Sequence, residues 1–141
     1  MSDVDLAGGC QCGTVRYRVT AAATWTMHCH CSMCRKCHGA IFVTFSTVPE
    51  GGFTIEQGEE SIRRFESSPG TKRHFCGTCG CQIYVQWMPA PGLIYLATGT
   101  LDEGAFPGPA VEKVNHIFVG SKVPWFEITD GRPQFEEEPP D

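Results

Sequence analysis

The nine cysteines of this chain fall into short-spaced groups, and thiolates at such spacings are typical ligands of zinc. Cys10-x-Cys12 lies near the N-terminus, and Cys76-x-x-Cys79 lies near the middle of the chain. Between them lies the triplet Cys29-x-Cys31-x-x-Cys34. Two pairs together make one closed four-sulfur site, whereas three thiolates leave one zinc position free for chemistry. The grouping therefore suggests a structural site and a second site that is open if no further side chain joins it.

Both cysteine pairs are followed directly by a glycine, Gly13 after Cys12 and Gly80 after Cys79. Such a pair binds one ion when the backbone folds into a tight knuckle, and glycine can take the left-handed conformation that this needs. Backbone N–H groups can then point at the sulfurs. We expect Cys10, Cys12, Cys76 and Cys79 to meet around one zinc ion, whose binding free energy of order 10 kcal/mol contributes to folding. The alternative is that either pair is a buried thiol pair or a labile disulfide.

The triplet is either an open site with three thiolate ligands or a site closed by a fourth ligand, and spacing alone does not decide between them. His28, His30, Cys37 or His38 can supply a fourth ligand and close the site. If Ser32 to Cys37 forms a helical turn capped by Ser32, Cys37 lies on the same side as Cys34 and can reach the metal. His30 lies between two ligands in an extended segment, so its side chain should point away from them. A third possibility is that Cys37 and Cys81 take part in redox chemistry.

The elements that must position these groups are short strands. The two-residue apolar period and β-branched or aromatic content predict strands at the following ranges: 14–20, 40–48, 61–67, 82–87, 93–98, 116–119 and 125–129. Gly/Pro turns separate several of them, and no useful window shows the helical period. The expected fold class is therefore all-β, with little helix.

The amino-acid composition and charge limit the kinds of partner that the protein can bind. The 141 residues suit one domain, expected at residues 1–135, with an acidic, mobile tail at residues 136–141. A net charge of −5 disfavours nucleic-acid binding, and no apolar run is long enough to cross a membrane. The acidic N-terminus does not look like a signal peptide, so we expect a cytoplasmic protein. An odd number of cysteines in a reducing compartment favours metal binding over disulfides.

Three ordered motifs resemble the glutathione-dependent formaldehyde-activating enzyme family, which also includes the domain of centromere protein V. They are Gly9 to Gly13, Cys29 to Lys36, and Phe75 to Gly80, and the stretch from His116 to Trp125 is also similar. The resemblance covers residues 8 to 135. It implies a β-tent fold with short antiparallel sheets around two zinc ions. Cys10, Cys12, Cys76 and Cys79 would bind the structural ion, and Cys29, Cys31 and Cys34 the catalytic ion.

The resemblance also implies a carbon–sulfur lyase that acts on glutathione or a related thiol adduct, such as the formaldehyde hemithioacetal S-hydroxymethylglutathione. Because glutathione has two carboxylates, its site needs cations, and the candidates are Arg35, Lys36, Lys72, Arg73 and Lys122. His30 and His116 are candidates for acid–base roles, and His116 also for substrate contact, although we expect each more often to be a buried, hydrogen-bonded histidine. The alternative functions are a non-catalytic zinc module and a thiol-based redox sensor. Whether the protein is a monomer or a homodimer stays open, as does the role of Cys81.

Overall fold

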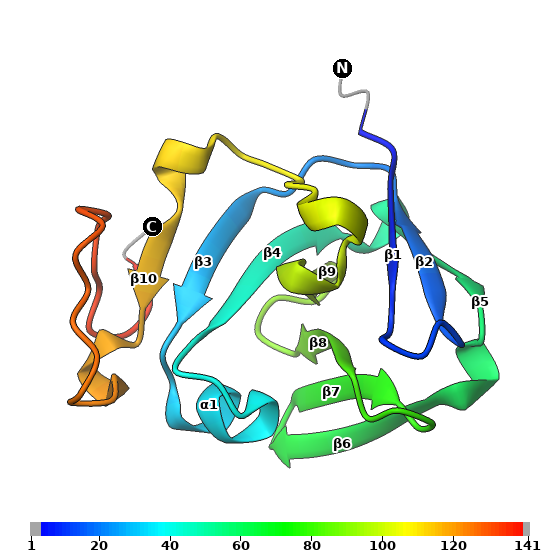
Figure 1. Cartoon of the computed structure of the whole chain (residues 1–141), viewed down its shortest axis with the longest axis horizontal. Helices are drawn as coiled ribbons and strands as arrows, with labels where there is room; N and C mark the ends of the chain where they lie inside the picture. The colour runs from blue at the N-terminus through cyan, green and yellow to red at the C-terminus, as the bar shows by residue number, and fades with distance from the viewer. Residues whose placement is uncertain (1–3, 140–141) are drawn as a thin grey trace.

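The computed structural model describes residues 4–139, which form two β-sheets and one α-helix (Figure 1). The three-stranded sheet has the order β1 (Leu6–Gly9), β2 (Arg16–Val19), β5 (Phe53–Gln57). The seven-stranded sheet has the order β10 (Asn115–Ile117), β3 (Trp25–Cys29), β4 (Val43–Pro49), β9 (Leu93–Ala97), β8 (Gln82–Trp87), β7 (Thr71–Cys76), β6 (Ile62–Ser68). Helix α1 spans Ser32–His38 and follows β3 after two residues.

Short 3₁₀ turns connect several of the strands. They are η1 (Glu50–Gly52), η2 (Glu59–Ser61), η3 (Thr98–Thr100), η4 (Asp102–Gly104), η5 (Val111–Lys113) and η6 (Val119–Ser121). No helix within residues 4–139 combines the length and the apolar character needed to cross a membrane. The all-β prediction with little helix is confirmed.

The sheets differ from the sequence prediction in several respects, beginning with four strands that the sequence did not indicate, namely β1, β3, β5 and β7. Strand β10 pairs with β3 in parallel, whereas the other strand pairs are antiparallel as expected. The strand predicted at residues 125–129 is wrong, because this segment has no regular structure and Trp125 is 74% exposed. Trp125 contributes nothing to the core, although it does line a surface pocket.

Each buried core cluster contains part of one cysteine group. The first cluster packs Cys10 and Cys76 with fully buried side chains of the strands and their connections, namely Val15, Tyr17, Val19, Val48, Ile83 and Leu96. The second cluster packs Cys29 and Cys34 with Met27, Val43, Phe45 and Val85. Packing therefore fixes the buried members of each sulfur group, whereas Cys12 and Cys79 of the first group are exposed.

The two faces of strand β3 carry different side chains, a cysteine and an apolar residue on one and a histidine on the other. Met27 and Cys29 belong to the second core cluster, whereas the ring of His28 packs against Phe42 and His116. Successive side chains of a strand point to opposite faces, so His28 lies on the face opposite Cys29. In the register of the sheet, His28 pairs with Thr44 of β4 and with His116 of β10.

The C-terminal segment lies beside β10 at one side of the molecule (Figure 1). His116 N–H donates to the carbonyl of Pro133, and Phe135 N–H donates to the carbonyl of His116, at 2.9 Å in both cases. Two residues of the expected mobile tail also make backbone contacts, since Glu136 and Glu137 accept hydrogen bonds from Gly120 and Phe118. Residues 140 and 141 lie outside the described part of the chain.

Candidate metal centres

The two cysteine pairs meet as the sequence predicts. The sulfurs of Cys10, Cys12, Cys76 and Cys79 all lie within 4.8 Å of one another. Cys12 Sγ is 3.6 Å from Cys10 Sγ and 3.8 Å from Cys76 Sγ. Four sulfurs about 2.3 Å from a tetrahedral zinc ion are spaced by about 3.8 Å, so this group fits such an ion without rearrangement. A metal here would join the β1–β2 connection to the end of β7.

Both knuckles have the predicted backbone conformation. Gly13 has φ of 82° and Gly80 has φ of 80°, which is the left-handed region. Val15 N–H donates to Cys10 Sγ at 3.2 Å, and Thr78 N–H donates to Cys76 Sγ at 3.4 Å. These backbone donors stabilise negative charge on the sulfurs before any ion is bound.

The four thiols differ in their readiness to lose a proton. Burial raises the pKa of Cys10 to about 11. The hydroxyl of Thr14, 3.1 Å from Cys12 Sγ, together with the Thr14 backbone N–H lowers the pKa of Cys12 to about 6. The contacts with Thr14 thus favour the thiolate form of Cys12, whereas burial favours the protonated form of Cys10 until a cation replaces the proton.

The triplet is a compact group at the start of α1. The sulfurs of Cys29, Cys31 and Cys34 lie within 4.8 Å of one another, and Cys29 Sγ is 3.5 Å from Cys34 Sγ. The helix begins differently from the prediction, because Cys31 caps it: Cys31 Sγ accepts a hydrogen bond from Cys34 N–H at 3.2 Å. Ser32 is the first helical residue and makes no cap. The helical turn still brings the sulfurs of Cys31 and Cys34 together, so the predicted grouping of the ligands does not change.

No fourth metal-binding side chain joins the triplet within the described residues. A histidine, cysteine or carboxylate that completed the site would lie within the same short distance of all three sulfurs, and none does. His30 points away as predicted, since its Nε2 lies 2.8 Å from His116 Nδ1. Cys37 lines a pocket instead of approaching the sulfurs. The geometry of the triplet is therefore that of a three-sulfur site.

Arg73 is a buried cation beside the triplet. Its side chain is 3% exposed, and its Nη2 lies 3.6 Å from Cys34 Sγ. Its Nε–H donates to Ser67 Oγ at 2.8 Å, whereas Nη1 has no partner within the described residues. The sequence indicated Arg73 only as a possible partner of a substrate carboxylate. Arg73 lies on a face of β7 that carries other buried side chains. The irregular order of buried and exposed residues along β7 hides this in the sequence.

The surroundings of Cys31 favour its thiolate form. Hydrogen bonds from the thiols of Cys29 and Cys34 lower the pKa of Cys31, and the positive charge of Arg73 acts in the same direction. The hydrogen bond with Cys31 is the first cause that raises the pKa of Cys29. The group thus holds at least one thiolate and can release its remaining protons to an incoming cation.

Histidines and Asp130 form a hydrogen-bonded chain on the other face of β3. His30 Nε2 lies 2.8 Å from His116 Nδ1, and His116 Nε2 lies 2.8 Å from Asp130 Oδ2. His30 is fully buried and His116 is 2% exposed. The expectation that these are buried, hydrogen-bonded histidines is confirmed. Both ring nitrogens of His116 are engaged in this chain, and its contact with glutathione stays a prediction. Sequence reasoning did not identify Asp130.

A pocket of about 460 Å³ lies at the end of α1 that follows the triplet. Cys37, His38 and Phe42 form part of its wall, and the rest comes from Ala40, Val43, Thr44, Gly80, Cys81, Gln82, Ala97, Gly99 and Thr100. Val43 and Ala97 also pack in the core cluster that holds Cys29 and Cys34. The wall contains neither lysine nor arginine, so cations for a substrate must come from outside it.

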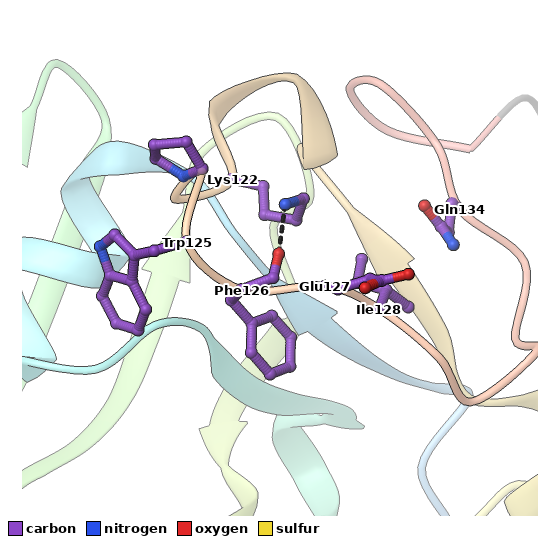
Figure 2. Close-up of a pocket in the computed structure, with 7 residues that line it drawn as sticks. Lys122, Trp125, Phe126, Glu127, Ile128 and Gln134 are labelled. Atoms are coloured by element: carbon purple, nitrogen blue, oxygen red, sulfur yellow. Dashed lines mark hydrogen bonds between the residues drawn. The ribbon is translucent and has the colours of Figure 1, made fainter.

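The predicted cations lie in different environments. Lys36 on α1 is exposed and Arg35 is partly buried, with its Nε unpartnered within the described residues. Lys72 is exposed on β7. The Lys122 ammonium donates to the backbone carbonyls of Val123 and Phe126 in a second hollow, which Trp125 and Ile128 also line (Figure 2). Lys122 is therefore already engaged, whereas Arg35 and Lys36 stay candidates.

Comparison with known proteins agrees with this geometry. The profile of the family "GFA: Glutathione-dependent formaldehyde-activating enzyme" matches residues 5–121. A Halomonas elongata protein named "Putative glutathione-dependent formaldehyde-activating enzyme" is 30% identical over 130 residues, which is 87% of this chain and 80% of that protein. A crystal structure of a Rhodobacter sphaeroides protein has a similar fold, with a TM-score of 0.61 and 24% identity over 70% of this chain and 89% of the other. The match of the family profile to most of the chain shows that this protein belongs to the glutathione-dependent formaldehyde-activating enzyme family.

Proposed function

We propose that the protein is a zinc-dependent carbon–sulfur lyase acting on a glutathione adduct such as S-hydroxymethylglutathione. Cys29, Cys31 and Cys34 would hold the catalytic ion, and Cys10, Cys12, Cys76 and Cys79 the structural ion. The observation that carries this proposal is a three-sulfur group with no fourth side-chain ligand among the described residues. Cysteine thiolates in tetrahedral arrangement favour zinc among the common divalent ions.

A zinc ion held by the triplet would offer its fourth position to an incoming thiol and lower the pKa of that thiol. The protein supplies the electrostatics around this position. Three thiolates and Zn²⁺ have a net charge of −1, which disfavours the approach of a further thiolate. The guanidinium of Arg73, in contact with Cys34 Sγ, offsets this charge inside the domain, where solvent screening is weak.

Substrate binding would involve the pocket at the end of α1. Its volume of about 460 Å³ lies in the range of small-molecule sites, which run from about 300 to 1,000 Å³. We expect Arg35 and Lys36, both on the helix that carries Cys34, to attract the carboxylates of glutathione. The exposed charge of Lys36 contributes more to association rate than to affinity.

The reaction forms or breaks one carbon–sulfur bond. In the direction of synthesis, the glutathione sulfur adds to the carbonyl carbon of formaldehyde, and a proton is taken up by the carbonyl oxygen. In the opposite direction, the hydroxyl loses that proton, the carbon–sulfur bond breaks, and free aldehyde and thiol leave. No oxidant or reductant is needed in either direction.

The test is catalysis of exchange between free formaldehyde and its glutathione adduct, followed by ¹³C exchange spectroscopy. Because the addition also runs without catalyst, the measured quantity is the rate above the protein-free rate. We expect Cys31→Ser to abolish the excess rate and Ser32→Ala, on the same helix but outside both the triplet and the pocket, to retain it. An excess rate that survives in Cys31→Ser, or none in zinc-loaded wild type, would contradict the proposal.

A thiol-based sensor is the second candidate, because Cys37 and Cys81 line the same pocket. Neither belongs to a cysteine metal group, so both thiols remain available for oxidation. Titration of free thiols after mild peroxide treatment would decide this point. The sensor hypothesis requires the loss of two thiols in wild type and no such paired loss in Cys81→Ser.

A further inference from the structure

A third set of side chains that could bind a metal lies on the face of β3 opposite the triplet. The ligand atoms of His28, His116 and Asp130 lie within 4.8 Å of one another. We call these three residues the His–His–Asp cluster. It contains none of the cysteines of the two sulfur groups, so metal binding by this cluster does not depend on the proposed lyase function.

The sheet itself brings the cluster together. His28 and His116 are direct partners in the parallel pairing of β3 with β10, so their side chains are neighbours on one face. Their ring centroids are 4.8 Å apart. Asp130 comes from the C-terminal segment, and its Oδ2 lies 2.8 Å from His116 Nε2. Three separate parts of the chain therefore converge on one point.

Each ligand of the cluster is held in place by a further contact. His28 Nδ1 is 2.8 Å from Thr44 Oγ1, and His116 Nδ1 is 2.8 Å from His30 Nε2. The second carboxylate oxygen of Asp130 accepts a hydrogen bond from Arg132 N–H at 3.0 Å. Histidine ligands of protein-bound metals characteristically have their other ring nitrogen engaged in this way, which fixes the ring and its tautomer.

Packing also restricts the two rings. Phe42 contacts His28 with ring centroids 4.6 Å apart and His116 with centroids 5.9 Å apart. Asp130 is 42% exposed on the other side, and His28 is half-buried, so an ion can reach the cluster from solvent. A rigid inner wall and an open outer side suit a site that binds an ion reversibly.

We propose that His28, His116 and Asp130 bind a divalent transition-metal ion such as Zn²⁺ or Co²⁺, in addition to any ions at the cysteine groups. Two imidazoles and one carboxylate are a donor set used by zinc and by other first-row metals, with at least one position left for water. The ion would replace the direct hydrogen bond between His116 Nε2 and Asp130 Oδ2. With the ion on Nε2, the ring proton of His116 would lie on Nδ1, which faces His30 Nε2.

The experiment uses the purified full-length protein and Co²⁺ as the probe. Metal content is measured first, and the protein is then titrated with Co²⁺ by calorimetry and examined by X-ray absorption at the cobalt edge. We expect one Co²⁺ per chain with nitrogen and oxygen neighbours at about 2.1 Å and no sulfur at about 2.3 Å. If the purified protein already carries this ion, Asp130→Asn and His28→Gln should each contain one metal fewer per chain.

Asp130→Asn and His28→Gln each remove one ligand from a partly exposed position and should weaken Co²⁺ binding at least tenfold. Asp5→Asn is the matched control, because Asp5 is an exposed carboxylate paired with Arg18, and its affinity should equal that of wild type. The proposal fails if no such Co²⁺ binds or if its neighbours are sulfur. It also fails if neither Asp130→Asn nor His28→Gln changes the affinity, and the cluster is then a purely structural hydrogen-bonded chain.

Discussion

Arg73 Nη2 lies 3.6 Å from Cys34 Sγ, although the two residues are 39 positions apart in the sequence. The contact places a permanent positive charge against a group of three sulfurs inside the domain. It connects β7, which ends at Cys76, with α1, which carries Cys34. The two cysteine groups are therefore linked through one strand.

Loss of the Arg73 charge should weaken metal binding at the triplet. Residues that contact metal ligands typically change metal affinity by about 10–100-fold when they are replaced. We expect Arg73→Gln to lose zinc from the triplet more readily, and Arg73→Lys to lie between it and wild type. Competition with a chromophoric chelator measures the affinity, and Arg64→Gln, an exposed arginine on β6, is the control. Equal affinities for Arg73→Gln and wild type would show that the contact has no electrostatic role.

Replacement of Cys76 should unfold the domain. Cys76 is fully buried in the first core cluster and contributes one of four ligands that join distant segments. Loss of the ion removes metal-binding free energy of order 10 kcal/mol, which exceeds the net stability of many small domains. Circular dichroism during thermal unfolding should show no cooperative transition for Cys76→Ser. Cys81→Ser, a nearby cysteine outside the ligand group, should unfold cooperatively, and the same behaviour in Cys76→Ser would refute the structural role.

Replacement of Cys31 should leave the fold intact. Cys31 caps α1 by accepting a hydrogen bond from Cys34 N–H, and serine is among the best residues for that position. We therefore expect Cys31→Ser to keep its midpoint of thermal unfolding within a few degrees of wild type while it binds one zinc ion fewer. Elemental analysis beside calorimetry tests both statements. A variant that keeps full zinc content would remove Cys31 from the ligand set.

Acid should destabilise the fold in part through His38. Burial lowers the pKa of His38 from 6.5 to about 4. The folded protein therefore favours the neutral ring, while the unfolded chain takes up a proton between about pH 6.5 and 4, so stability falls as the pH is lowered through this range. Urea unfolding at pH 7 and pH 5 should show a smaller loss for His38→Gln than for wild type. An equal loss in both proteins would assign the pH dependence to other groups, such as the metal-binding thiols.

The sequence predicted the parts of the structure that rest on local pattern. Strand β8 has the predicted bounds, because its alternating apolar residues form one buried face. The two cysteine pairs form knuckles as their spacing indicated, because a knuckle with glycine after the second cysteine is a local structure. The all-β class follows from the absence of a helical period.

Features that depend on strand pairing were not predictable in this way. Strand β1 contains two glycines and little β propensity, and it forms because it pairs with β2. Strand β7 buries Arg73 and His74 side by side, so no apolar alternation marks it. The row of Thr44, His28 and His116 exists only through the register of three strands, and Asp130 joins it from a segment without regular structure.

The central claim is that Cys29, Cys31 and Cys34 hold a zinc ion whose fourth position accepts a thiol. Zinc-edge X-ray absorption of the two-zinc protein, with and without glutathione, tests it most directly. For the Asp130→Asn protein, in which the cysteine groups alone are expected to bind metal, the account predicts an average of about 3.5 sulfur neighbours per zinc, rising to about 4 with glutathione. An average of 4 before glutathione is added, or no change when it is added, would contradict the account.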